Sequence, residues 1–169
     1  MSEKPPFATA EPNVLYETEG CVFGTWRNIF VVTWTTRGTG PLVDLLAAET
    51  DVFAKAHSEG FSVIHVIAKN PPLPTSEARD KLIAETQKFA PQLACVGTVL
   101  EGSGFWASAV RSFVVGIRLL VPRTFEMQTY ASIAEIAAWL PPLHTARTGV
   151  AMTPTELEHV LVTLRRRLD

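Results

Sequence analysis

Glu101 and Ser103 are polar residues at a position where an expected strand gives way to an expected helix. They follow an apolar run at 93–100, which predicts a buried strand, and they precede an apolar stretch with helical spacing. Ligands of open α/β sheets bind at the carboxyl ends of the strands, so this pair could hold a polar ligand group. A solvated loop explains the same residues. Nucleophilic catalysis by Ser103 would need a neighbouring base, and the sequence places none beside it.

The four histidines do not group as metal ligands. His65 lies in the apolar run 61–68 with apolar neighbours on both sides, which favours a hydrogen-bonded core or interface histidine over a titrating one. His57, His144 and His159 lie near expected helix ends or in a linker, and their spacing is unlike that of zinc ligands. We therefore expect no metal, no cofactor and no catalytic residue.

Residues 93–130 form the central unit of the expected fold. The strand 93–100 is followed by a helix at 105–121, which ends at Pro122, and then by a strand at 125–130. A strand, a helix and a strand in this order normally form a right-handed parallel crossover. A membrane span is the alternative for 105–121, but the stretch is short for a bilayer and contains two arginines, so we expect no span.

The elements on either side of this unit alternate between strands and helices. Their expected positions are strands at 14–18, 21–26, 29–36 and 61–68, and helices at 41–58, 76–90 and 132–140. Turn residues between the second and third strands predict a hairpin. Ser132 with Glu135, and Thr153 with Glu156, have the spacing of capping boxes. Pro141-Pro142 are expected to close the helix from 132, and residues 143–152 to form a linker before the last helix.

The last helix carries Leu157, Leu161, Leu164 and Leu168 in one stripe. Their spacing of four, three and four residues predicts an apolar face. This face could pair with a helix of another chain, or it could dock on its own domain. Deletion of 148–169 would distinguish these two roles.

The composition favours one folded domain that does not bind nucleic acid. The chain has 169 residues, of which 47% are hydrophobic and 19% charged, with a net charge of −2. A balance this close to neutral gives no electrostatic attraction for nucleic acid. The hydrophobic content requires either a sheet covered on both faces or an apolar surface that meets a partner. The first residues contain no apolar signal segment, and the two cysteines, Cys21 and Cys95, are expected as buried thiols, so we expect a cytoplasmic protein.

The order of elements predicts an α/β fold with a single mixed sheet flanked by helices, an N-terminal β-hairpin and an extra C-terminal helix. We expect a flexible segment at 1–12, an α/β domain at 13–146, and a linker with an amphipathic helix at 147–169. Over about 13–143 this order resembles the STAS family and its SpoIIAA-like, anti-sigma-factor-antagonist relatives. The resemblance rests on the N-terminal hairpin, on the strand FSVIHVIA before a capped helix, and on the closing segment FEMQTYASIAEIAAWL.

The resemblance implies a non-enzymatic switch or scaffold. In that family a serine at the start of the helix after a central strand is phosphorylated by a partner kinase, and Thr75 and Ser76 occupy the matching place at the start of helix 76–90. A phosphate there would meet the free N–H groups of the first helical turn. The family's Asp-Ser-Ser-Gly type of signature is absent, and a plain helix cap is the alternative role for either residue.

Two functions from different classes remain open. The first is a regulatory or scaffolding domain that acts through protein contacts, as a homodimer, with helix 104–122 and the last helix as candidate surfaces. The second is a carrier of a small molecule or lipid, because Phe105, Trp106, Phe113 and Ile117 could line an apolar cavity. Core packing explains the same four residues. An enzyme is the third and least supported class, since no acid–base pair or nucleophile constellation is visible.

Overall fold

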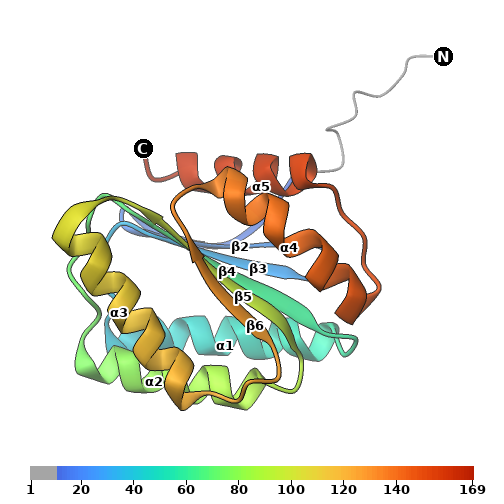
Figure 1. The fold of residues 1–169 in the computed structure, drawn as a ribbon, viewed down its shortest axis with the longest axis horizontal. Coiled ribbons are helices and arrows are strands. Elements are labelled where there is room, and N and C mark those ends of the chain that lie inside the picture. Colours follow the sequence, from blue (N-terminus) through green and yellow to red (C-terminus); the bar gives the residue numbers. More distant parts are fainter. Residues whose placement is uncertain (1–10) are drawn as a thin grey trace.

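The computed structural model describes residues 11–169, so the expected flexible segment 1–12 lies almost entirely outside the described residues. These residues form a six-stranded sheet and five helices (Figure 1). The elements are β1 (Asn13–Glu17), β2 (Cys21–Trp26), β3 (Ile29–Trp34), α1 (Gly40–Ala56), β4 (Phe61–Ala68), α2 (Ser76–Phe89), β5 (Leu93–Glu101), α3 (Gly104–Leu120), β6 (Glu126–Tyr130), α4 (Ile133–Thr148) and α5 (Pro154–Arg166).

The strands lie in the sheet in their order along the chain, from β1 to β6. The pairs β1–β2 and β2–β3 are antiparallel, whereas β3, β4, β5 and β6 are parallel to one another. The expected mixed sheet with an N-terminal hairpin is therefore confirmed, and so is the parallel crossover within 93–130.

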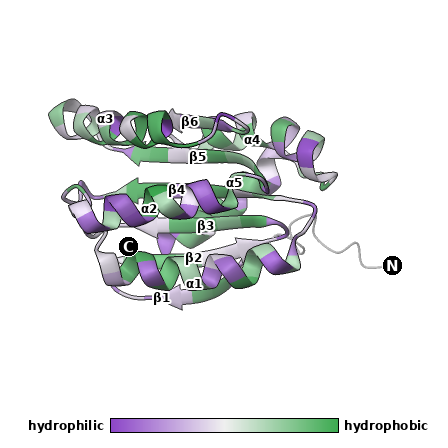
Figure 2. Ribbon diagram, turned by 90° about the horizontal axis from the view of Figure 1, so that it is seen from below, coloured by the Kyte–Doolittle hydropathy of each residue, from purple (hydrophilic) through white to green (hydrophobic). Residues whose placement is uncertain are grey.

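The handedness of the crossovers decides which face each helix covers. The connections β3–α1–β4, β4–α2–β5 and β5–α3–β6 all step across the sheet in the same direction, so right-handed crossovers put their helices on one face. The opposite face is left to α4 and α5. Figure 1 shows this arrangement, with α4 and α5 above the sheet and α1 and α2 below it, and Figure 2 views the α1–α3 side.

Each face of the sheet has its own core. Beneath α1 and α2 the phenylalanines Phe30, Phe53, Phe61 and Phe89 pack edge to face with ring centroids 5.5–5.8 Å apart. On the opposite face, aliphatic residues of β2, β3 and β4 pack against α4 and α5. Cys21 lies in the first core and Cys95 in the second, so the two free thiols are on opposite faces and cannot form a disulfide.

The expected end of α4 at Pro141-Pro142 is wrong. The helix continues through both prolines to Thr148, and Gly149 ends it in the left-handed conformation with φ 75°. Each proline removes one backbone N–H donor from the helix. The continuation buries Pro141, His144 and Thr148, and this burial offsets the lost hydrogen bonds. The expected linker therefore shrinks to 149–153, and α4 crosses the expected boundary at 146.

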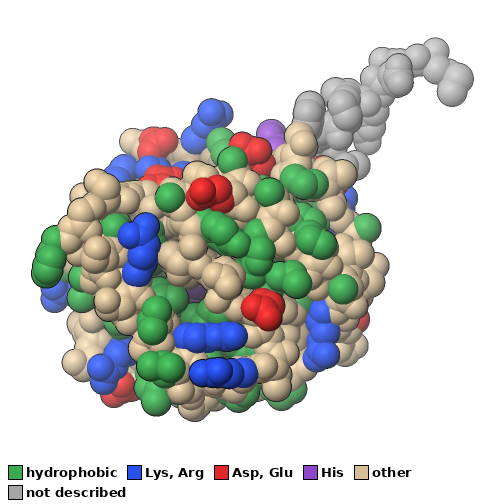
Figure 3. Space-filling view, in the orientation of Figure 1, with side chains coloured by type: hydrophobic (Ala, Val, Ile, Leu, Met, Phe, Trp, Pro, Cys, Tyr) green, Lys and Arg blue, Asp and Glu red, His purple; other side chains and the backbone are tan. Residues whose placement is uncertain are grey.

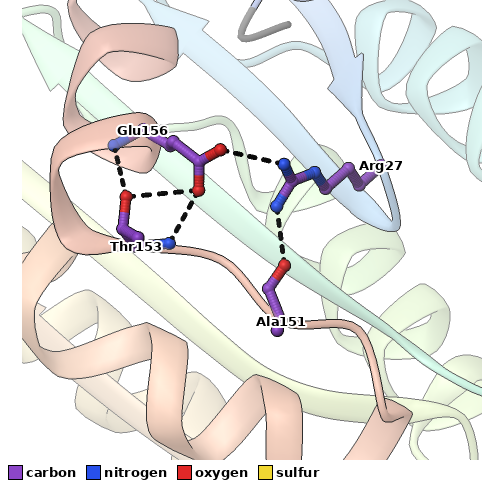
Figure 4. A network of polar contacts seen from close by, with 4 residues as sticks. All are labelled: Arg27, Ala151, Thr153 and Glu156. Carbon is purple, nitrogen blue, oxygen red and sulfur yellow. Dashed lines mark hydrogen bonds and ion pairs between the residues drawn. The ribbon is translucent and has the colours of Figure 1, made fainter. Parts of the chain in front are cut away.

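The start of α5 is tied to the hairpin of β2 and β3 by Arg27 (Figure 4). Its guanidinium donates to the Ala151 carbonyl at 2.6 Å and to Glu156 Oε1 at 3.0 Å. Glu156 also accepts from the Thr153 backbone N–H at 2.9 Å and completes the expected capping box. These hydrogen bonds, led by that from Thr153, lower the pKa of Glu156. The Glu156 carboxylate thereby joins the cap of α5 to the turn between β2 and β3.

None of the helices in the described part of the chain is long and apolar enough to cross a bilayer. This holds for α3, for which a membrane span was the alternative interpretation.

Candidate functional site

A small cavity lies between the sheet and the helices α2 and α3. It consists of two adjoining pockets of about 90 Å³ and about 60 Å³, which share His65, Leu82, Thr86 and Val96. One water molecule needs roughly 10–15 Å³, so each pocket exceeds the space that a single water fills. We call this space the sheet–helix cavity.

The parallel strands supply the floor of this cavity. Trp34, His65, Val96, Thr98 and Met127 come from β3, β4, β5 and β6 and line the larger pocket from the same face of the sheet. They share a face because side chains alternate along each strand and because the register places His65 opposite Thr98. The loop 71–74 and helices α2 and α3 supply the walls. Most of the lining is apolar, with a few polar groups, which is the usual makeup of a small-molecule site.

Trp34 and His65 form a hydrogen-bonded pair at the cavity floor. The indole N–H of Trp34 donates to His65 Nδ1 at 3.1 Å, and the two rings are nearly parallel, with an interplanar angle of 17°. Burial lowers the pKa of His65 to about 4, so the ring is neutral at pH 7. The expectation of a hydrogen-bonded core histidine is consistent with this contact.

Glu85 contributes a carboxyl group to the smaller pocket. Its Oε2 is buried and has no hydrogen-bond partner within 11–169. Burial is the largest cause that raises the pKa of Glu85. A buried carboxyl oxygen without a partner is costly, so this position points to a group that the protein itself does not supply.

The candidate residues for an apolar cavity are only partly brought together. Trp106, Phe113 and Ile117 line the larger pocket, and Trp106 Nε1 donates to the Pro71 carbonyl at 2.7 Å, which holds the loop 71–74 against α3. Phe105 is 90% exposed and does not reach the cavity. It lies one residue before Trp106 on α3, so its side chain points to a different side of the helix.

Glu101 and Ser103 have different surroundings at the end of β5. Glu101 Oε2 accepts a hydrogen bond from Arg165 Nε of α5 at 2.8 Å, and Arg165 also pairs with Asp169. Ser103 precedes α3 with an exposed side chain that makes no capping hydrogen bond. The Glu101 carboxylate, which was a candidate ligand contact, ties α5 to the end of β5.

Thr75 and Ser76 differ in what their hydroxyl groups do. Thr75 is the N-cap of α2 and accepts from the Ala78 backbone N–H at 3.1 Å. Ser76 follows it with an exposed side chain. The capping alternative therefore describes Thr75, and phosphorylation of Ser76 stays a prediction.

The leucine stripe of α5 packs inside its own domain. Leu157, Leu161 and Leu164 have no exposed surface, and Leu168 is 5% exposed. All four belong to the core beneath α4 and α5. Of the two roles that the stripe left open, docking on its own sheet is the one observed, so these leucines offer no surface to a second chain.

A buried chain of polar side chains was not anticipated from the sequence. His144 Nε2 lies 2.7 Å from Asn28 Oδ1, and His144 Nδ1 lies 2.7 Å from Ser62 Oγ. Ser62 Oγ in turn lies 3.2 Å from Cys95 Sγ, and Asn28 Nδ2 donates to the Gly60 carbonyl at 2.9 Å. The side chains come from α4, β4, β5 and the β2–β3 turn, and only the fold brings them together.

These hydrogen-bonded side chains include the residue types of a catalytic triad, but a substrate cannot reach them. Asn28, Ser62 and His144 are each at most 1% exposed, and none of them lines either pocket of the sheet–helix cavity. Burial also lowers the pKa of His144 to about 4 and raises that of Cys95 to about 11. A neutral histidine and a protonated thiol without access to substrate fit an internal brace between α4 and the sheet.

The outer face of α3 carries exposed apolar side chains. They are Phe105, Val115, Leu119 and Leu120. Figure 3 shows hydrophobic side chains at the edge of the molecule where α3 lies. Apolar residues grouped on one surface are typical of sites that meet a partner.

Within residues 11–169, no three His, Cys, Asp or Glu side chains lie close enough together to hold a metal ion.

Comparisons with known proteins support the fold. No family model and no curated protein matches the sequence. Among solved structures, the chain is similar to an uncharacterized protein of the DUF3478 family with a SpoIIAA-like fold from Shewanella loihica PV-4. The match has a TM-score of 0.52 and 13% sequence identity, and it covers 72% of this chain and 93% of that one. The SpoIIAA-like α/β fold that the order of elements predicted is therefore confirmed.

Proposed function

We propose that the protein binds a small, mostly apolar molecule in the sheet–helix cavity and acts as a carrier or sensor without catalysing a reaction on it. The single observation that carries this proposal is the cavity itself, with its apolar lining of Trp106, Val110 and Phe113 around a few polar groups. For comparison, an apolar cavity of about 150 Å³ is enough to bind benzene. The pockets of about 90 Å³ and about 60 Å³ thus suit a compact ligand better than a long acyl chain.

A cavity-filling variant tests this function. Val110 of α3 lines the cavity and is 4% exposed, so Val110→Phe is expected to occupy part of the space and to weaken toluene binding at least about tenfold. Isothermal titration calorimetry at pH 7 measures the affinity. Val115→Phe makes the same substitution on the exposed face of the same helix and should bind toluene as the natural chain does. Absence of toluene binding to the natural chain would count against the function.

A second candidate function, contact with proteins through α3, is favoured by the exposed apolar side chains of that helix. In this candidate function the protein is a regulatory or scaffolding homodimer, in which the exposed apolar faces of α3 from two copies cover each other. Leu119 is 68% exposed, and an exposed leucine at a contact would be buried on association. Ser76, exposed at the start of α2, is the position at which phosphorylation would switch such contacts.

The oligomeric state tests this second candidate. We expect sedimentation equilibrium to give the mass of a dimer for the natural chain and the mass of one chain for Leu119→Arg, because a charge in an apolar contact is left without a partner. Arg111→Lys, also on the exposed side of α3, should leave the dimer intact. A natural chain that stays monomeric at high micromolar concentration would argue for the cavity alone.

A further inference from the structure

The tautomer of His65 is fixed by Trp34. An indole N–H can only donate a hydrogen bond, so His65 Nδ1, which lies 3.1 Å from Trp34 Nε1, must be the unprotonated acceptor. The proton of the neutral ring is then on Nε2. Among residues 11–169 the His65 side chain makes its hydrogen bond through Nδ1, and the side chain lines both pockets of the cavity. His65 therefore offers the cavity one hydrogen-bond donor.

Glu85 offers the complementary group. Its buried, unpartnered Oε2 is an acceptor, and its side chain lines the smaller pocket together with His65. That pocket measures about 60 Å³, which is room for one small polar group of a ligand. A hydroxyl group both accepts and donates a hydrogen bond, and it is the smallest organic group that satisfies a donor and an acceptor at once.

The charge of the lining excludes an anion. No Lys or Arg of the described chain lines either pocket, so a carboxylate or phosphate inside would lack a counter-charge. The carboxyl group of Glu85 would also repel it. Most of the remaining lining is apolar and favours a hydrocarbon body.

We propose that the sheet–helix cavity takes a compact, uncharged apolar molecule with one hydroxyl group, which accepts from His65 Nε2–H and donates to Glu85 Oε2. This inference rests on the proposed function, because it specifies the ligand of the same cavity. Trp34 acts as a positioning residue, since it holds the imidazole in the tautomer that donates into the cavity.

Three probes of similar size test the assignment. Toluene has no polar group, phenol has a hydroxyl group and benzoate has a carboxylate. Calorimetry at pH 7 measures the dissociation constant of each. In His65→Phe we expect the ratio of the toluene constant to the phenol constant to fall about tenfold, which is the effect of one lost hydrogen bond. His57→Phe, outside both pockets, should leave the ratio unchanged. Benzoate should bind the natural chain at least about tenfold more weakly than phenol does.

Two further measurements do not depend on the His65 variant being folded. Nitrogen-15 chemical shifts of the natural protein should show His65 with its proton on Nε2, and a proton on Nδ1 would overturn the assignment. In Glu85→Leu the dissociation constants of phenol and benzoate should differ less than they do in the natural chain.

The outcomes separate this inference from the function on which it rests. If toluene binds and the toluene-to-phenol ratio is the same in His65→Phe, a water molecule satisfies the polar groups, and the hydroxyl assignment fails while the cavity remains a binding site. If none of the three probes binds, both the inference and the proposed function fail.

Discussion

Leu161→Ala is expected to lower the free energy of unfolding by about 2–5 kcal/mol. Leu161 has no exposed surface and packs between α4 and the sheet. Truncation to alanine removes apolar contacts and leaves a cavity that the surrounding strands cannot close. For a domain of this size the loss corresponds to a fall in Tm of roughly 5–15 °C. Urea unfolding followed by circular dichroism measures the change.

Glu158→Ala is the matched control for this prediction. Glu158 is exposed on the same helix, so its truncation should change the free energy of unfolding by less than about 0.5 kcal/mol. A Leu161→Ala protein as stable as the Glu158→Ala protein would mean that α5 does not pack on the sheet in solution.

His144→Leu is expected to destabilise the fold by about 1–3 kcal/mol at pH 7. The substitution keeps most of the side-chain volume but leaves Asn28 Oδ1 without its donor at a site with no access to water. Ser62 Oγ also loses a partner at 2.7 Å. Denaturant unfolding measures the loss. Ala146→Leu, at an exposed position on the same turn, should stay within about 0.5 kcal/mol of the natural chain.

The same histidine gives the stability a definite dependence on pH. Burial lowers the pKa of His144 from 6.5 to about 4 in the folded state. Between these values the unfolded chain binds a proton that the folded chain does not, so stability falls as the pH is lowered through this window. Burial lowers the pKa of His65 in the same way. As the pH falls, the natural chain should therefore lose the stability contributed by two neutral histidines, and the His144→Leu chain that of one. Equal pH dependence in both proteins would contradict the burial of a neutral His144.

More of the fold than of the candidate site could be predicted from the sequence. Strand β4 and both capping boxes were predicted because they depend on local patterns. The helix α4 was cut short at Pro141-Pro142 because the local cost of proline is visible in the sequence. The compensating contacts of His144 with Asn28 and Ser62 are not visible there, since they span 116 and 82 residues.

The polar groups of the cavity were missed for a related reason. Trp106, Phe113 and Ile117 were candidates from their helical spacing, but the polar groups come from separate elements. Trp34 and His65 are 31 residues apart, and only the parallel pairing of β3 with β4 brings them together. The glutamate at 85 lies within an ordinary charged helix pattern, so nothing in the sequence distinguished it from a solvated residue.

The one-sided placement of α1, α2 and α3 has a consequence during protein synthesis. All six strands precede α4 and α5 in the chain, so a ribosome completes the sheet before the helices that cover its second face exist. At about 5–20 residues per second, that apolar face stays open for a few seconds in each nascent chain. Its residues include Val31, Ile64 and Val66, which have no exposed surface once the fold is complete. We therefore expect the nascent chain to bind chaperones that recognise apolar strands until α5 has been made.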